Sequence, residues 1–324
     1  MKLNYYTTYQ IYSEVNIKIA IIGAGTIGTI YGALFSKYEH DVKFYVRNSS
    51  INKYNAPLTC KIIDEHHVFP SSFSYTRNIF SNVQELDHFD LIIVCVRHYQ
   101  IDDIVELLKH TSKPNILFFC NNWGTLEKIS STLSPERVFF GMPRAGGCIS
   151  DQHLLEGGLL NQVILGNTNH PFFTSICELF EQAQIVVTKI DKMQDWYWTH
   201  LATTIAWSTG AAKTKGFLTF SRSFSALRQA MLVGRQTLNI AKARGADINC
   251  CRDADVFKLP TIIGAFLLLK VMKIPIIQAI SSGHGYAVED LQKAYYDVLA
   301  EGEKQHVDVT LLKSYAQYIE QMSY

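Results

Sequence analysis

The chain has 324 residues, of which 48% are hydrophobic and 18% are charged, and its formal net charge is +1. This composition is typical of one large or two medium globular domains, and it excludes a disordered protein. A chain this close to neutral, without a run of Lys or Arg, is not expected to bind nucleic acid. Its seven cysteines are scattered and include no Cys-x-x-Cys pair, which indicates a reduced cytoplasmic protein.

No segment is predicted to enter a membrane. Residues 1–16 contain several tyrosines but no continuous apolar run, so we interpret them as an N-terminal extension rather than a secretory signal. The stretch from Leu259 to Ile280 is the most apolar later segment, but two prolines and two lysines interrupt it. That interruption favours buried helices over a bilayer span, and the helices are a candidate homodimer face as well as a candidate monomer core.

The segment from residue 17 to residue 38 predicts a strand, a turn and a helix in immediate succession. Ile19 to Ile22 is an apolar run long enough for a strand buried on both faces. Apolar residues recur at helical spacing from Ile27 to Phe35. Between the two lies Gly-x-Gly-x-x-Gly, so the order is the one that a dinucleotide-binding βαβ unit requires.

Each glycine of this motif has a physical role at a dinucleotide. Gly23 permits a tight turn, Gly25 lets backbone N–H groups approach a pyrophosphate, and Gly28 lets the helix pack close to the strand. The partial positive charge of the helix N-terminus then faces the anion. A glycine-rich turn without a ligand is the alternative, but the flanking strand and helix favour nucleotide binding. The predicted cofactor contacts in the turn are Gly23, Gly25, Thr26, Ile27 and Gly28.

The next strand refines the cofactor. It is predicted over Asp41 to Val46 and is followed by Arg47 and Asn48. Sites that prefer NAD usually carry Asp or Glu about 20 residues after the glycines, where it binds the ribose 2′-hydroxyl. No carboxylate occurs here between residues 44 and 54, and a guanidinium can bind a 2′-phosphate with two hydrogen bonds. We therefore expect NADP(H), bound by Arg47 and Asn48; the alternative is a solvated arginine at a strand end.

Two more apolar strands end in polar residues. Leu91 to Val96 is followed by Arg97, and Asn115 to Cys120 is followed by Asn121. In an open parallel sheet the carboxyl ends of the strands line the ligand crevice. We therefore expect one groove to collect the strand ends at Gly23, Arg47, Arg97 and Asn121.

The remaining pattern divides the chain in two. Beyond Asp191 it changes from mixed strands and helices to long helices, so we expect a Rossmann-type α/β domain over 17–190 and an all-α domain over 191–324. The other elements expected before the boundary are a strand pair over Leu58–Phe69, a helix over Ile101–His110, strands over Val138–Gly141, Leu159–Leu165 and Ile185–Val187, and a helix over Pro171–Gln184. The helices expected after it are Gln194–Lys213, Ser223–Arg244, Ala254–Met272, Ala287–Gly302 and Val309–Met322.

Together these segments resemble the ketopantoate reductase family over the chain after residue 16. The matching segments are GAGTIG at 23–28, VRN at 46–48, VCVRHYQ at 94–100 and NNWGTLE at 121–127. The last is the most specific, because it looks like that family's N-G-x-G-x-x-E turn, although Asn122 replaces a glycine. The resemblance implies reduction of a 2-keto acid by NADPH, with Asn121 beside the nicotinamide and Arg97 near the phosphates.

The same resemblance places the proton donor at the start of the first helix of the second domain. The family pattern there is W-x-K, followed by Asn four residues later and again four residues beyond. Trp196 matches the tryptophan, and the three functional positions then hold Trp198, Ala202 and Ala206. An indole cannot supply a proton near neutral pH, and alanine makes no hydrogen bond to a substrate. We therefore expect a substrate other than ketopantoate.

Few residues are candidates for the missing acid. His200 lies on the same helix and His284 lies between two glycines, and imidazole exchanges a proton near neutral pH. The alternatives are a structural histidine at 200 and an ordinary loop histidine at 284. Arg144, before a Gly-Gly pair, is a candidate for binding a carboxylate, with a solvated loop arginine as the alternative. The predicted catalytic set is His200, His284 and Asn121, and no metal is expected.

Three functions stay open from the sequence. The first is an NADPH-dependent oxidoreductase acting on a small keto or hydroxy acid, with its site between the two domains. The second is a dinucleotide-binding sensor or scaffold without turnover, which the replaced positions favour. The third is a dehydrogenase of the 3-hydroxyisobutyrate or 6-phosphogluconate type, but the G-x-x-x-K-x-x-x-N pattern expected of those enzymes is not found in the sequence.

Overall fold

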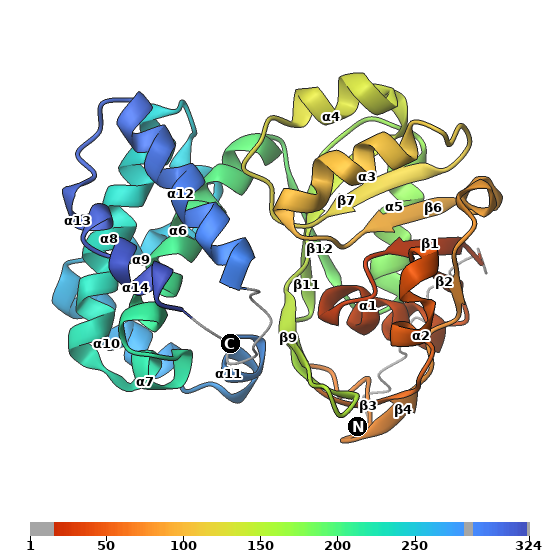
Figure 1. The fold of residues 1–324 in the computed structure, drawn as a ribbon, viewed down its shortest axis with the longest axis horizontal. Helices are drawn as coiled ribbons and strands as arrows, with labels where there is room; N and C mark the ends of the chain where they lie inside the picture. The colour runs from red at the N-terminus through yellow and green to blue at the C-terminus, as the bar shows by residue number, and fades with distance from the viewer. Residues whose placement is uncertain (1–15, 282–287, 323–324) are drawn as a thin grey trace, which may run out of the picture.

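The protein is described here from a computed structural model, which describes residues 16–281 and 288–322 (Figure 1). Every described strand lies before residue 191, and every described element from α6 (Met193–Lys213) onward is helical. In Figure 1 the sheet part and the helical part lie side by side. This arrangement confirms the predicted fold class, a Rossmann-type α/β part followed by an all-α part. The predicted N-terminal extension lies outside the described residues, except for Asn16.

The main sheet has eight strands in the order β12-β11-β8-β7-β6-β1-β2-β5. Five neighbouring strands from β8 to β2, together with the edge strand β5, run parallel, whereas β11 pairs antiparallel with β8. The central strand β1 is fully buried from Ile19 to Ile21, as its unbroken apolar run predicts. The strands are β1 (Lys18–Ile22), β2 (Asp41–Tyr45), β5 (Ile79–Phe80), β6 (Leu91–Val94), β7 (Asn115–Phe119), β8 (Val138–Met142), β11 (Gln162–Gly166) and β12 (Val186–Ile190).

A second sheet of four strands has the order β4-β3-β10-β9. Its strands are β3 (Leu58–Asp64), β4 (Phe73–Tyr75), β9 (Ala145–Ile149) and β10 (Leu154–Leu159). The predicted strand pair over Leu58–Phe69 is therefore wrong. The Asp64 carboxylate accepts hydrogen bonds from the N–H groups of His66, Val68 and Phe69, and these bonds hold the chain in a turn instead of a second strand.

Helices flank both faces of the main sheet and make up the second part of the chain. The prediction of one helix over Ala254–Met272 is wrong, because Pro260 interrupts it and the Arg235 guanidinium binds the freed carbonyls of Phe257 and Leu259. The helices of the sheet part are α1 (Thr26–Lys37), α2 (Ile51–Tyr54), α3 (Ile101–Leu108), α4 (Leu126–Leu133) and α5 (Phe172–Gln182). Those that follow α6 are α7 (Phe217–Arg222), α8 (Phe224–Ala243), α9 (Asp255–Lys258), α10 (Thr261–Val271), α11 (Pro275–Ser281), α12 (Val288–Lys304), α13 (Thr310–Lys313) and α14 (Ala316–Glu320).

The apolar stretch from Leu259 to Ile280 forms α10 and α11. Within the described residues, no single helix is long and apolar enough to span a bilayer, and only these two pass that test as a pair, bent by 95°. α10 is apolar on both its buried and its exposed side: Gly264, Ala265 and Leu268 are buried, whereas Ile262 and Ile263 are exposed. The stretch therefore supplies part of the helical core and also an exposed apolar face.

Candidate functional site

The ends of four neighbouring strands lie at one level of the main sheet. Ile22 pairs with Tyr45 of β2 on one side and with Val94 of β6 on the other, and Val94 pairs with Phe118 of β7. All four strands are parallel, so their carboxyl ends form one continuous edge. The segments that begin at Gly23, Val46, Cys95 and Phe119 therefore follow one another along this edge, as expected for a dinucleotide site.

The glycine turn is shaped as a phosphate cradle. Gly23 has a φ of +113°, and a Cβ there would lie 2.3 Å from the carbonyl oxygen of Cys95. A Cβ on Gly28 would lie 2.0 Å from the carbonyl oxygen of Gly23, whereas nothing lies within 4 Å of one on Gly25. Thr26 and Ile27 begin α1, whose first turn has no side-chain cap and no acidic residue. Free N–H groups thus face open space at Gly25, which fits a pyrophosphate.

The predicted phosphate-binding residues lie beyond the strand ends. Arg47 and Asn48 are exposed after β2. Arg97 is half-buried after β6, and its backbone N–H donates to Gln100 Oε1 at 3.1 Å. Within the described residues, neither arginine forms an ion pair, so both guanidinium groups have free donors for an anion.

Arg77 is a cation near the glycine turn that the sequence analysis missed. Its side chain is 3% exposed, Nη1 donates to the Ala24 carbonyl at 2.8 Å, and the guanidinium lies 5.0 Å from the ring centre of Tyr54. Burial lowers the pKa of Arg77, and among the described residues it has no carboxylate partner. A buried charge without a counter-ion is costly, so its position beneath the turn fits a phosphate-bearing ligand. No local sequence signal distinguishes this arginine, because its neighbours in space are distant in the chain.

Replacing Arg77 by Met should weaken the binding of NADPH and of NADH to a similar extent, by roughly 10-fold, because both nucleotides contain the pyrophosphate. Nucleotide fluorescence titration would measure the two dissociation constants. Arg77→Lys, which keeps the charge, should lose less. Unchanged binding of both nucleotides by a well-folded Arg77→Met variant would contradict this role.

Asn121 lies two residues after β7, at the junction of the two parts. It lines a cavity of about 10 Å³ with Thr204 of α6 and Asp290 of α12, among others. Its Oδ1 is buried and has no hydrogen-bond partner within the described residues. Since an unsatisfied buried carbonyl oxygen is costly, it indicates an acceptor kept for a ligand donor such as an amide.

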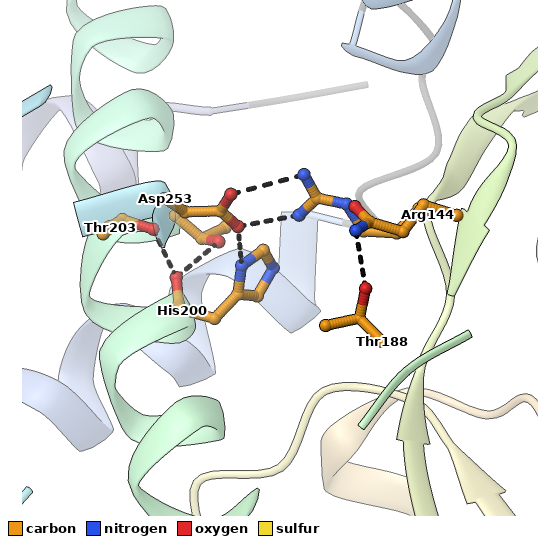
Figure 2. Close-up of polar contacts among 7 residues, drawn as sticks. Arg144, Thr188, His200, Thr203 and Asp253 are labelled. Carbon is orange, nitrogen blue, oxygen red and sulfur yellow. Dashed lines mark hydrogen bonds and ion pairs between the residues drawn. The ribbon is translucent and has the colours of Figure 1, made fainter. Parts of the chain in front are cut away.

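His200 belongs to a three-residue polar cluster between the two parts (Figure 2). Its Nδ1 lies 2.8 Å from Asp253 Oδ2, and Arg144 Nη1 donates to the same oxygen at 2.8 Å. Trp196 stacks on the imidazole, with ring centres 4.8 Å apart. Arg144 comes from the loop between β8 and β9 in the sheet part, whereas Asp253 belongs to the helical part. Their ion pair therefore joins the two parts.

The cluster fixes which nitrogen of His200 can exchange a proton. Burial raises the pKa of Asp253, but the hydrogen bonds and charges of His200 and Arg144 outweigh this and hold it well below its usual range. An ionised carboxylate only accepts hydrogen bonds, so His200 Nδ1 must be the donor to Asp253. Nε2 is then the nitrogen that gains or releases a proton, the arrangement that suits a general acid.

Cys251 lies beside this cluster. The ligating atoms of His200, Cys251 and Asp253 are within 4.8 Å of one another, as in a metal site. However, Arg144 already binds Asp253, and its charge would repel a cation. Burial also raises the pKa of the Cys251 thiol, which disfavours the thiolate that a metal needs. The group fits a hydrogen-bonded acid better than a metal centre.

Of the three α6 positions matched from sequence, only Trp198 contacts the sheet part. Ala202 and Ala206 are fully buried in the helical core. Trp198 Nε1 donates to the Trp123 carbonyl at 3.0 Å, and Arg244 stacks on its ring. The face that meets Asn121 instead carries Thr204, one turn after His200. The predicted His284 lies outside the described residues.

His98 joins the sheet part to α12. Its Nδ1 lies 2.6 Å from Asp290 Oδ1, and its Nε2 lies 3.4 Å from Asp297 Oδ2. Burial lowers the pKa of His98, but the two carboxylates outweigh it and raise this pKa to about 9. Sequence reasoning gave His98 no role, because its partners lie almost 200 residues away and no local pattern announces them.

Comparison with known proteins places the edge and the glycine turn in a family. Residues 19–155 match the family described as Ketopantoate reductase PanE/ApbA. The chain carries a ketopantoate reductase-family domain. That domain includes the glycine turn, Arg47, Arg77, Arg97 and Asn121, whereas His200 and Asp253 lie after it.

Individual relatives agree with this assignment. The chain is 27% identical over 140 residues to a 2-dehydropantoate 2-reductase of Listeria innocua, which covers 41% of this chain and 44% of the relative. It is 31% identical over 104 residues to a glycerol-3-phosphate dehydrogenase [NAD(P)+] of Rickettsia bellii, covering 31% of each chain. These matches thus span less than half the length of each curated relative.

Solved structures share the fold over nearly the whole chain. A 2-dehydropantoate 2-reductase from Geobacter metallireducens GS-15 superposes with a TM-score of 0.68 at 18% identity, covering 95% of this chain and 100% of that one. A D-mandelate dehydrogenase in complex with NADH superposes with a TM-score of 0.67 at 12% identity, covering 94% and 98%. The fold of the ketopantoate reductase-family domain and its helical partner is therefore that of these enzymes.

Proposed function

We propose that this protein is an NADPH-dependent oxidoreductase that reduces a 2-keto acid or related carbonyl, other than ketopantoate, to a hydroxy acid. The observation that carries the proposal is the pair His200–Asp253, which Arg144 of the sheet part holds, one turn before the α6 residue Thr204 that lines a cavity with Asn121. It supplies an oriented proton donor on the helix that contacts the loop after β7, and the end of β7 belongs to the edge where a dinucleotide fits. We also propose residues 17–190 and 191–324 as the two functional domains.

The contacts favour a second register for the family pattern on α6. W-x-K with asparagines at four-residue intervals also fits from Trp198, which places His200, Thr204 and Ser208 at the three functional positions. Thr204 lines the cavity with Asn121, whereas Ala202 and Ala206 of the first register are in the core. In this register all three functional positions keep a polar side chain. An imidazole stands in place of the family's lysine ammonium, and two hydroxyls stand in place of its two asparagine amides, which supports a changed substrate.

Each residue has a defined task in this proposal. When bound, the reduced nicotinamide supplies the hydride to the carbonyl carbon. His200 Nε2 gives its proton to the carbonyl oxygen, while Asp253 accepts from Nδ1 and balances the charge of the imidazolium. Arg144 is a positioning residue that fixes Asp253. Asn121 Oδ1 would accept from the carboxamide of the nicotinamide, which orients the ring.

Turnover tests the function directly. NADPH consumption should be steady with at least one member of a panel of 2-keto acids that includes aromatic and branched side chains, and ketopantoate should be a poor substrate. Tight NADPH binding without turnover across the panel would instead support the alternative, an inactive sensor of the same fold.

Arg47→Ala tests the cofactor preference. Arg47 is exposed after β2 and forms no ion pair with any described residue. Its replacement should therefore weaken NADPH binding by roughly 10-fold or more and leave NADH binding nearly unchanged. Titration of both nucleotides would measure the ratio. An equal loss for both would overturn the assignment of the 2′-phosphate to Arg47.

We also propose that the protein forms a homodimer through α10 and that it is located in the reducing cytoplasm. Ile262, Ile263 and Phe266 are each more than half exposed on one helix. A Staphylococcus aureus ketopantoate reductase of the same fold is described as dimeric (TM-score 0.63, 13% identity, covering 94% of this chain and 98% of that one). All seven cysteines are free thiols, which supports the compartment.

Sedimentation velocity should therefore show a dimer for the natural chain and a monomer for Ile263→Asp, since an interface cannot bury an unpaired carboxylate cheaply. Val186→Asp, an equally exposed apolar position on the sheet part, is the matched control and should remain dimeric. A monomeric natural chain would rule out this interface.

A further inference from the structure

A second cavity, of about 410 Å³, lies between α3, the start of α4 and α12. Its lining includes His98, Asn122 and Trp123 from the sheet part and Arg244 and Lys293 from the helical part. None of the glycine turn, Arg47, Arg97 or Asn121 lines it. The cavity lining thus differs from the residues proposed for the dinucleotide, with His98 between this cavity and the small one at Asn121. Its volume is in the range of small-ligand sites.

The cavity wall is basic. Its cations are His98, Lys128, Arg244, Lys293 and Lys304, against the carboxylates Asp102, Asp297 and Glu301. Several of the cations are paired, as Lys128 is with Asp102. Lys293 is not: within the described residues it forms no ion pair, and its Nζ lies 5.7 Å from the ring centre of Tyr99. An excess of positive charge is thus left for an anion.

Arg244 is held rigidly at the cavity wall. Its guanidinium lies 4.5 Å from the ring centre of Trp123 and 3.9 Å from that of Trp198, so both indoles fix its plane. Nη1 donates to the Trp123 carbonyl at 2.7 Å. The nearest carboxylate oxygen, on Glu301, is 3.8 Å from Nε. A guanidinium held in this way loses little conformational freedom when it binds an oxyanion.

Asn122 provides a second, independent sign of a ligand. Its side chain is 7% exposed, and its Oδ1 accepts from the Gly124 N–H at 2.8 Å. That bond fixes the orientation of the amide, so Nδ2 is the group left over. Nδ2 is buried and has no partner within the described residues. A buried amide donor in the wall of a basic cavity indicates an acceptor that the chain itself does not supply.

We propose that this cavity binds a small dianion, either a phosphate ester or a dicarboxylate, through Arg244, Lys293 and Asn122 Nδ2. The ligand would bridge the loop after β7 and the helix α12, which belong to different parts of the chain. It would therefore strengthen the same junction that His98 forms with Asp290 and Asp297. The proposal does not depend on turnover or on the dinucleotide.

Titration of the full chain with inorganic phosphate and with malonate tests the proposal, at constant ionic strength set by chloride and without nucleotide. Calorimetry gives the affinity, and intrinsic fluorescence reports on Trp123 in the cavity wall. At least one anion should bind saturably at millimolar concentrations. Saturation by phosphate alone identifies the phosphate ester, and saturation by malonate alone identifies the dicarboxylate.

Variants locate the binding. Lys293→Met should weaken it by roughly 10-fold, and Arg244→Met by at least as much. Lys293 is exposed and carries no ion pair, so its replacement should not affect folding even if Arg244→Met does. Lys242→Met, an exposed lysine on α8 outside the cavity, is the matched control. Absence of saturable binding by both anions, or equal affinity for Lys293→Met and Lys242→Met, would overturn the proposal and leave the proposed oxidoreductase activity untouched.

Discussion

A His200→Gln variant should lose roughly 100- to 10,000-fold in kcat, the usual contribution of a positioned general acid. Glutamine can still donate a hydrogen bond to Asp253, so the Arg144–Asp253 pair should survive, but it has no proton to transfer. The affinity for NADPH should be unchanged, because His200 lies outside the glycine turn and the strand ends. Steady-state rates with the best substrate, together with nucleotide titration, would separate these two effects.

The control for this variant is His88→Gln, which changes an exposed histidine with no recorded contact in the described residues. It should retain the full rate. The Asp253→Asn variant should also have a low kcat. A neutral amide cannot stabilise the imidazolium, and its NH₂ group can face Nδ1 in place of an acceptor oxygen. If His200→Gln retained kcat within a few-fold of the natural chain, the proton donor would have to be another residue.

Raising the pH above 9 should lower the free energy of unfolding, because His98 then loses its proton. Its pKa in the folded state is about 9, above the usual 6.5, so the stabilisation is fully present below 6.5 and is lost as the pH rises through 9. The shift corresponds to roughly 3 kcal/mol at most, since the two aspartates are partly exposed and screened. Chemical denaturation of the natural chain between pH 7 and pH 10 would measure the loss.

His98→Gln should remove most of this pH dependence and should be less stable than the natural chain at pH 7. Other groups that titrate at high pH are shared by both proteins, so the difference between the two curves isolates His98. His88→Gln again serves as the control, because His88 has no carboxylate partner in the part of the chain that the structure describes. Parallel curves for the natural chain and His98→Gln would show that His98 does not carry the effect.

The parts of the fold that depend on local sequence were predictable. The strand Lys18–Ile22, the glycine turn and the helix Thr26–Lys37 follow one another directly, so their apolar periods and glycines define them without tertiary information. The second sheet was not predictable, because β3 pairs with β10 about 95 residues later. Nothing within Leu58–Asp64 indicates that partner.

The same distinction holds for the site. Motifs predict the glycines and Asn121 as cofactor contacts, but they give no sign of Arg77, because only folding places it beneath Ala24. The register of α6 shows the limit clearly. Trp196 and Trp198 both satisfy the start of the pattern, and a shift of two residues rotates the chosen positions by about 200° around the helix. The choice between them rests on tertiary contacts, since Thr204 lines the cavity with Asn121 whereas Ala202 and Ala206 are in the helical core.

The ion pair between Arg144 and Asp253 connects separate halves of the molecule, and this has a consequence for a working cycle. Any hinge motion that let a product escape would pull the guanidinium away from the carboxylate, since one is anchored near β8 and the other beyond α8. Asp253 would then keep His200 as its remaining partner among the described residues. In the cycle proposed above, opening would therefore separate Asp253 from Arg144, and closure over a new substrate would restore the ion pair.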